Sequence, residues 1–351
     1  MKFTKRLILL VLILFISVLY GCTETTSENT NIEAQKRFVG GSSGVVTSVS
    51  TDKSNNLVGV GESFSYMVDV KNTGEYDLQA NDYIVKLLIP QDPGVFEGGT
   101  YGELTLNNEN VASGTGLNPD GSTIPNGEFE IKTIPLKWAS VTKPVDYDLS
   151  YRYCYKYETR ADSILCKKSD LQGRISDDEK NTGCSYPEFG SSISQTTHNS
   201  NGPVQFSNLV QTIQNADSMR FTFDLSIIGG GNVGLADQGR DELTRCEWRP
   251  NDVTSDKVTV TIKSEAGLVE CDNLKQSTHS TEGNLDVLVG IVEFNDESST
   301  SKKISCKYKP ENIGNAHDNL ELKATYDYAK TETLSEQIKF LKSNHTTINS
   351  R

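Results

Sequence analysis

The sequence predicts an all-β protein that consists of two tandem β-sandwiches. Apolar and polar residues alternate in short runs, as in 64–70, where Phe64, Tyr66, Val68 and Val70 share one face. A period of two is typical of a half-buried strand. The same alternation recurs in 220–227, 257–262 and 320–328, and no segment of a dozen or more residues after the N-terminal stretch keeps a helical period.

The two halves of the chain also resemble each other. Three matches occur in the same order: 64–78 with 219–235, 82–90 with 256–264, and 149–166 with 322–340. The third match places Tyr155 over Tyr328. Any two β-domains share the alternation of apolar and polar residues, so the alternative is that these matches arose by chance. An ordered series of three matches favours duplication. Each half would then hold about seven short strands, the number typical of an immunoglobulin-like sandwich.

The composition along the chain predicts where the domains, the linker and the tail begin and end. We expect a first sandwich over 43–168, a linker over 169–202, a second sandwich over 203–342 and a tail over 343–351. A structureless connection as long as this linker is unusual inside one compact domain. The acidic run Asp177–Glu179 within it is interpreted as solvated charge rather than as a calcium site.

The N-terminal residues have the layout of an export signal. Three cations precede an uncharged apolar stretch over 7–21, which is shorter than the roughly 20 residues of a membrane span. Residues 19–22 resemble a lipobox, so residues 1–21 are expected to be a signal peptide and Cys22 the lipidated residue. The alternative is an uncut helix that anchors the chain. Residues 22–42 are expected to be a flexible tether. Both alternatives place the body on the extracellular face of the cell membrane.

The other six cysteines fit an exported protein. An even number of cysteines in a secreted chain predicts disulfides. Cys154 and Cys166 flank a candidate hairpin and are expected to pair, as are the strand-borne Cys271 and Cys306. Elimination leaves Cys184 with Cys246. The sequence contains no CxxC, so a zinc cage has no support.

The charge of the chain limits its partners. The formal net charge is −13, and it falls to −16 without the three cations of the signal stretch. Phosphate binding needs concentrated Lys and Arg, so no nucleic-acid partner is expected. An acidic body would also be repelled by anionic lipid, so we expect the N-terminus to provide the membrane attachment.

Three stretches suggest chemistry. The run 151–157 places four tyrosines on one face of a strand, and we interpret them as core residues rather than as a stacking platform for sugars. Gly229, Gly231 and Gly234 have GxGxxG spacing, but no helical pattern follows, so we interpret them as an inter-strand loop rather than a dinucleotide site. Gly40–Gly44 matches GxSxG around Ser42 and is interpreted as a hinge, because a strand-like run follows it.

No catalytic arrangement stands out, and neither a cofactor nor a metal is expected. The four histidines, His198, His279, His317 and His345, lie in polar, loop-like contexts without HxH or HExxH spacing. The chain is therefore not expected to be an enzyme. The motif 344–346 makes Asn344 a candidate glycosylation acceptor.

The run "CYKYETRADSILC", the cysteine-bearing linker and the strands from 220 to 328 resemble uncharacterised secreted or membrane-tethered proteins of small-genome archaea, over roughly 150–342. The first half more loosely resembles CARDB-type adhesion modules. These resemblances imply immunoglobulin-like sandwiches at a cell surface and no functional residues. We expect a non-catalytic surface protein with a structural, adhesion or scaffold role. The alternative is a lipoprotein that captures a glycan or peptide ligand for a membrane complex.

Overall fold

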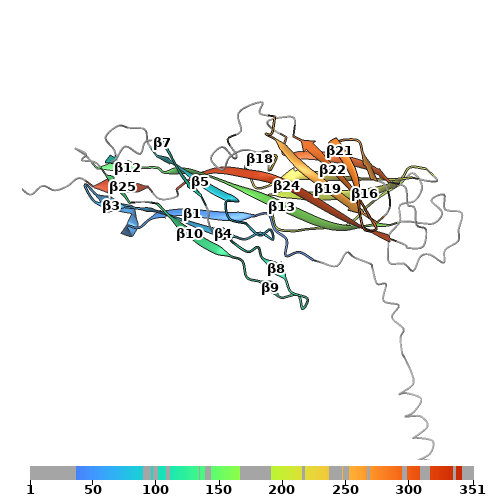
Figure 1. Cartoon of the computed structure of the whole chain (residues 1–351), viewed down its shortest axis with the longest axis horizontal. Coiled ribbons are helices and arrows are strands. Elements are labelled where there is room, and N and C mark those ends of the chain that lie inside the picture. The colour runs from blue at the N-terminus through green and yellow to red at the C-terminus, as the bar shows by residue number, and fades with distance from the viewer. Residues whose placement is uncertain are drawn as a thin grey trace, which may run out of the picture. The chain divides into compact units, whose positions relative to one another are not determined.

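The computed structural model describes a β-rich body that lies within one unit of the chain. It covers residues 37–89, 96–97, 102–107, 111–133, 135–138, 144–166, 191–215, 218–236, 247, 253–265, 267, 269–294, 299–308, 317–334 and 337–341. Strands dominate these residues, and one 3-10 turn, η1 (Ser54–Asn56), joins β1 to β2 (Figure 1). The all-β prediction is confirmed.

The strands fall into two series along the chain. The first series is β1 (Val45–Thr51), β2 (Leu57–Gly59), β3 (Ser63–Phe64), β4 (Tyr66–Asn72), β5 (Tyr83–Ile89), β6 (Phe96–Glu97), β7 (Gly102–Asn107), β8 (Gly116–Leu117), β9 (Thr123–Ile124), β10 (Glu128–Lys132), β11 (Leu136–Trp138), β12 (Val145–Tyr147) and β13 (Ser150–Cys166). The second series is β14 (Ser192–Ser194), β15 (Thr197–Asn199), β16 (Val204–Ile213), β17 (Met219–Ile227), β18 (Asn232–Gly234), β19 (Lys257–Ser264), β20 (Val269–Cys271), β21 (Lys275–Glu282), β22 (Leu285–Glu293), β23 (Ser301–Tyr308), β24 (His317–Thr333) and β25 (Ile338–Leu341).

The largest sheet runs through both halves. Its main path is β21-β22-β19-β24-β13-β5-β7, with β15 and β18 added at its side. A five-stranded sheet, β14-β16-β17-β23-β20, belongs to the second half, and a three-stranded sheet, β1-β4-β10, to the first. Alternating burial along β4 and β17 follows the period of two in their sequences, so each presents one apolar face to the core.

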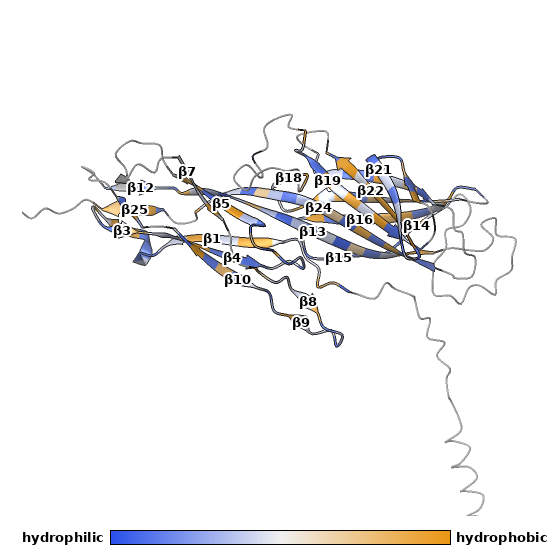
Figure 2. Cartoon of the chain, viewed as in Figure 1, coloured by the Kyte–Doolittle hydropathy of each residue, from blue (hydrophilic) through white to orange (hydrophobic). Residues whose placement is uncertain are grey.

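The sequence did not predict the junction between the halves. β13 and β24 are antiparallel over all 17 positions, from Ser150 opposite Thr333 to Cys166 opposite His317. Figure 1 shows the two strands side by side, and Figure 2 shows apolar and polar residues alternating along them. The buried apolar residues of both halves form one continuous cluster. The halves therefore share a sheet and a core.

The register of this junction shows a local symmetry. Tyr155 lies opposite Tyr328, and Tyr157 lies opposite Tyr326. The sequence match had placed Tyr155 over Tyr328, so each residue is the pairing partner of its own counterpart. Two antiparallel copies that pair in this way are related by a two-fold axis through that pair.

The same register corrects one of the sequence matches. Arg152 pairs with Lys86 of β5, and its counterpart Thr325 pairs with Thr259 of β19. Lys86 therefore corresponds to Thr259, whereas the match of 82–90 with 256–264 placed it over Val260. A shift of one residue exchanges the two faces of a strand. The alignment was wrong by that one position.

The C-terminal strand contacts the first half. β25 pairs with β12 in antiparallel and with β2 in parallel orientation. Ile338 and Phe340 of β25 are fully buried in the common core. The end of the chain is thus hydrogen-bonded to strands that lie nearly 200 residues or more before it, which short-range sequence patterns do not reveal.

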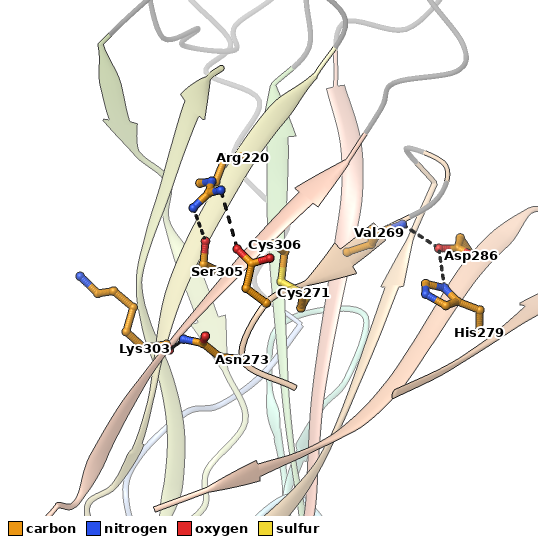
Figure 3. The surroundings of a disulfide bond; sticks show 10 residues. Arg220, Val269, Cys271, Asn273, His279, Asp286, Lys303, Ser305 and Cys306 are labelled. Carbon is orange, nitrogen blue, oxygen red and sulfur yellow. Dashed lines mark hydrogen bonds and ion pairs between the residues drawn. A yellow bond between two sulfur atoms is a disulfide. The ribbon is translucent and has the colours of Figure 1, made fainter. Parts of the chain in front are cut away.

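The structure contains the predicted disulfide between Cys271 and Cys306, which are cross-strand partners of β20 and β23 (Figure 3). Polar contacts surround it: the Arg220 guanidinium donates to Ser305 Oγ at 3.0 Å, and the Asn273 amide donates to the Lys303 carbonyl at 2.8 Å. This bridge ties the short edge strand β20 to β23, its neighbour in the five-stranded sheet.

The predicted pairing of Cys154 with Cys166 is wrong. Both cysteines lie on the single strand β13, twelve positions apart, where the sequence suggested a hairpin. Twelve extended residues span roughly 40 Å, and a disulfide needs Cα atoms within about 7 Å. Each of the two is disulfide-bonded, but not to the other.

Several predictions fall outside the described residues: the signal or anchor at 1–21, lipidation of Cys22, the Cys184–Cys246 bridge, the acidic run 177–179 and glycosylation of Asn344. Within the described part of the chain, no helix is long and apolar enough to cross a membrane.

Candidate binding cleft

A cleft of about 260 Å³ opens beside the two-fold junction, and we call it the tyrosine cleft. The chain segment 42–47, which leads into β1, forms one wall. Tyr153 and Tyr155 of β13 and Tyr328 of β24 form the floor. Pro203, Ile228, Gly229, Lys330 and Glu332 complete the lining. The cleft therefore brings together parts of all three stretches that the sequence singled out.

The tyrosine rings of the floor are packed against one another. Tyr153 and Tyr155 stack with ring centroids 6.2 Å apart and planes 5° from parallel, and Tyr155 lies 5.3 Å from Tyr328. Tyr155 is 1% exposed and Tyr153 is 4% exposed. The interpretation of this row as core is confirmed for the rings. Little of either ring is therefore open to the cleft.

The tyrosine hydroxyls of the floor are held in the neutral form. Burial raises the pKa of Tyr155 well above its usual value, and neighbouring tyrosines add to the effect. Burial also raises the pKa of Tyr153, and it raises the pKa of Tyr328 to about 12. These hydroxyls therefore offer hydrogen-bond donors across the neutral range, and they are poor bases or nucleophiles.

One carboxylate at the cleft is fixed in its charged form. Burial acts to raise the pKa of Glu332, but hydrogen bonds from Lys330, Tyr151 and Tyr153 outweigh it, and the pKa is lowered. The Lys330 ammonium lies 2.8 Å from Glu332 Oε1, and the Tyr151 hydroxyl donates to Oε2 at 2.9 Å. The Lys330–Glu332 pair therefore brings one positive and one negative charge to the cleft and adds no net charge.

Three glycines of the two glycine-rich motifs are in close contact with tyrosine side chains. A Cβ on Gly229 would lie 2.5 Å from the Tyr328 hydroxyl oxygen, and one on Gly231 would lie 2.6 Å from the same ring. A Cβ on Gly44 would lie 3.0 Å from the Tyr155 hydroxyl oxygen. The motifs thus serve packing around the cleft, a signal that a search for nucleotide or nucleophile motifs does not detect.

The structure can be compared with the predictions for the two glycine-rich motifs, 229–234 and 40–44. Strand β18, not a helix, follows Gly231, so 229–231 is an inter-strand connection as predicted, but Gly234 lies at the end of β18. The segment 40–44 was interpreted as a hinge around Ser42. In the structure, Ser42, Ser43 and Gly44 belong to the wall of the cleft.

The segment 37–44, here called the entry segment, is tied down by a polar network beside the cleft. The Glu75 carboxylate accepts hydrogen bonds from the backbone N–H of Val39 at 2.8 Å, Gly40 at 3.1 Å and Asn201 at 2.6 Å. Asn201 Oδ1 in turn accepts from the Ser43 N–H at 2.8 Å. Hydrogen bonds to a carboxylate are strong, so this network fixes the path of the chain into β1.

The described histidines lie outside the cleft. His198 stands opposite Asp162 in the pairing of β15 with β13, and His317 begins β24. His279 of β21 lies 3.9 Å from Asp286, whose carboxylate also accepts the Val269 N–H (Figure 3). No group of three or more His, Cys, Asp or Glu side chains that could hold a metal ion occurs in the described part of the chain.

Comparisons with known proteins give little guidance. No family model and no curated protein match the chain. One matched structure is that of the Enterococcus faecalis MSCRAMM ACE, which its title says binds its ligands by the collagen hug model. It is 9% identical with a TM-score of 0.13, covering 87% of this chain and 97% of that chain. Another is the collagen adhesin CNA from S. aureus, which is 8% identical with a TM-score of 0.16, covering 85% and 92%. TM-scores this low support no conclusion about the fold or the function of this chain.

Proposed function

We propose that this chain is a non-catalytic cell-surface binding protein that contacts its partner at the tyrosine cleft. The observation that supports the proposal is the convergence of segment 42–47, the Tyr153–Tyr155 row and Gly229 on one concave site. Concave sites with a few fixed polar groups are the usual location of ligand binding. The groups at this one are neutral hydroxyls and a closed ion pair, which bind rather than exchange protons.

The cell-surface part of the proposal rests on the sequence. The export-signal layout at 1–21 and the six cysteines beyond Cys22 support folding in an oxidising exterior. Attachment through a lipid on Cys22 or through an uncut helix would place the cleft outside the membrane. Intact-mass measurement of the membrane-extracted protein tests this part, because it reports loss of the first 21 residues, added acyl chains and missing thiol hydrogens together.

The binding part of the proposal is tested with one pair of matched variants. Ile228 lines the cleft and is 48% exposed, whereas Val253 is 77% exposed and does not line it. The full chain in detergent is applied to a glycan array and a peptide array, alongside Ile228→Arg and Val253→Arg. Ligand signals that disappear only in Ile228→Arg support the proposal. Absence of any signal, or equal signals in all three proteins, contradicts it.

A second candidate role is structural, with the body acting as a spacer or scaffold at the cell surface. The continuous pairing of β13 with β24 favours it, because a sheet and core shared between halves give a stiff body. Such a role requires no occupant of the cleft. The arrays described above separate the two roles.

A further inference from the structure

The main chain of this protein is itself held by tyrosine hydroxyls around the cleft. The Tyr157 hydroxyl donates to the Asn201 carbonyl at 2.7 Å, and the Tyr151 hydroxyl, which donates to Glu332 Oε2 at 2.9 Å, also lies 3.3 Å from the Thr47 carbonyl. The Tyr157 oxygen also accepts from the Glu75 N–H at 3.0 Å. These tyrosines lie on the same face of β13 as Tyr155, so hydroxyls of this row approach main-chain groups of the protein itself.

Tyr155 is the member of this row whose hydroxyl has no hydrogen-bond partner among the described residues. No described residue hydrogen-bonds to its hydroxyl, and the side chain lines the cleft. Because burial raises its pKa well above the usual value, the hydroxyl stays protonated and can donate. Its neighbours on either side, Tyr153 and Tyr157, both have hydrogen-bond partners. The open position in the row is therefore that of an acceptor oxygen, such as the main-chain carbonyl of Asn201 that accepts from Tyr157.

The surroundings favour a polypeptide over a sugar. Sugar platforms present an exposed aromatic face, but here Tyr153 and Tyr155 stack on each other and both side chains are almost fully buried. β1, whose first residues line the cleft, is an edge strand of its sheet. Strand edges bind extended peptides through main-chain hydrogen bonds. The closed Lys330–Glu332 pair favours no charged side chain.

The size of the cleft indicates how much of a ligand it holds. A volume of about 260 Å³ is below the roughly 300–1,000 Å³ of sites that enclose a whole small molecule. A short stretch of a longer chain fits such a site, with the remainder passing along the surface.

We propose that the tyrosine cleft binds an extended polypeptide segment of a partner protein, whose main-chain carbonyl accepts a hydrogen bond from Tyr155. This inference rests on the proposed function and names its ligand class. The cleft then recognises the main chain of the partner and not a charged side chain. The partner segment would be unstructured or β-stranded before binding, because helical carbonyls are already paired.

The test uses the full chain in detergent, a surface-bound library of short unstructured peptides and a glycan array. Tyr155→Phe removes one hydroxyl and keeps the packing, and we expect it to weaken peptide binding about 5- to 10-fold, the effect of one hydrogen bond. Tyr147→Phe is the control, since Tyr147 donates to the Leu88 carbonyl and does not line the cleft. It should leave binding unchanged.

The outcomes separate the two proposals. Peptide binding that falls in Tyr155→Phe, and that weakens when a single backbone amide of the bound peptide is replaced by an ester, whose carbonyl is a weaker acceptor, supports both. Glycan binding that Ile228→Arg abolishes, without peptide binding, keeps the proposed function and overturns the polypeptide inference. Peptide binding that is equal in Tyr155→Phe and wild type also overturns the inference. No binding of either class overturns both.

Discussion

Tyr155 and Tyr328 lie directly opposite each other in the β13–β24 pair, with ring centroids 5.3 Å apart. They are counterparts in the two halves of the chain, and both rings end at the floor of the tyrosine cleft. The junction that joins the halves is therefore also the place where the candidate site forms. Changes to the tyrosine packing should affect stability and binding together.

The first prediction concerns the glycines that touch the tyrosines. A Cβ at Gly74 would lie 1.5 Å from the Tyr157 hydroxyl oxygen, so Gly74→Ala must displace that ring or the loop. We expect a loss of about 1–3 kcal/mol in the free energy of unfolding, measured in urea. Gly116→Ala is the control, because its nearest contact is an ordinary 3.4 Å from the Ile124 side chain. Equal stability of the two variants would contradict the packing account.

The second prediction concerns the Cys271–Cys306 disulfide, which closes a loop of 35 residues. Loop-closure entropy predicts that Cys271→Ala with Cys306→Ala lowers the free energy of unfolding by about 4 kcal/mol. The comparison is made under oxidising conditions, so that the bonds of Cys154 and Cys166 stay intact in both proteins. Unchanged stability of the double variant would show that this bridge does not stabilise the fold.

The third prediction concerns alkaline pH. Burial raises the pKa of the core tyrosines Tyr66, Tyr83, Tyr155, Tyr157, Tyr308 and Tyr326. The unfolded chain releases these protons near pH 10, and the folded chain retains them. Their contribution to stability is present below pH 10 and is lost as the pH rises above it. We expect a steep fall in the free energy of unfolding there.

Ultraviolet absorbance of tyrosinate provides the measurement for this prediction. In the folded protein a group of tyrosines should ionise only as the chain unfolds, whereas in urea all 14 should titrate near pH 10. A reversible titration of all tyrosines near pH 10 without unfolding would contradict the buried row.

The fourth prediction concerns the entry segment. Glu75→Gln removes the charge that accepts hydrogen bonds from Val39, Gly40 and Asn201. We expect faster amide hydrogen exchange at those three residues, with little change in the melting temperature, since the contact is local. Glu130→Gln, on an exposed position of β10, is the matched control. Identical exchange in the two variants would show that the Glu75 contacts do not hold the segment.

Sequence patterns predicted the local structure well and the long-range pairing poorly. The period of two identified strands such as β4 and β17 because half-buried strands must alternate. The hairpin around Cys154 and Cys166 was wrong because 150–166 is one long strand without a turn, which its sequence does not distinguish from two short ones. The β25 pairing with β2 depends on residues about 280 positions apart, which no local pattern encodes.

The candidate site was only partly predictable. The sequence marked the tyrosine row and both glycine motifs, but it could not show that Gly44, Gly229 and Tyr155 meet, because they come from three separate elements. It also gave no sign that Glu75 and Asn201 secure the entry segment. Their hydrogen bonds span 126 residues between the two halves.

Hydrogen-exchange footprinting of the full chain, with and without a bound peptide from the library, tests the central claim most directly. We predict slower exchange at 42–47 and at 228–229, the two stretches of backbone that line the tyrosine cleft, and unchanged exchange along the exposed edge strand β21. Protection confined to β21 or to another surface, with the cleft unaffected, would contradict the account.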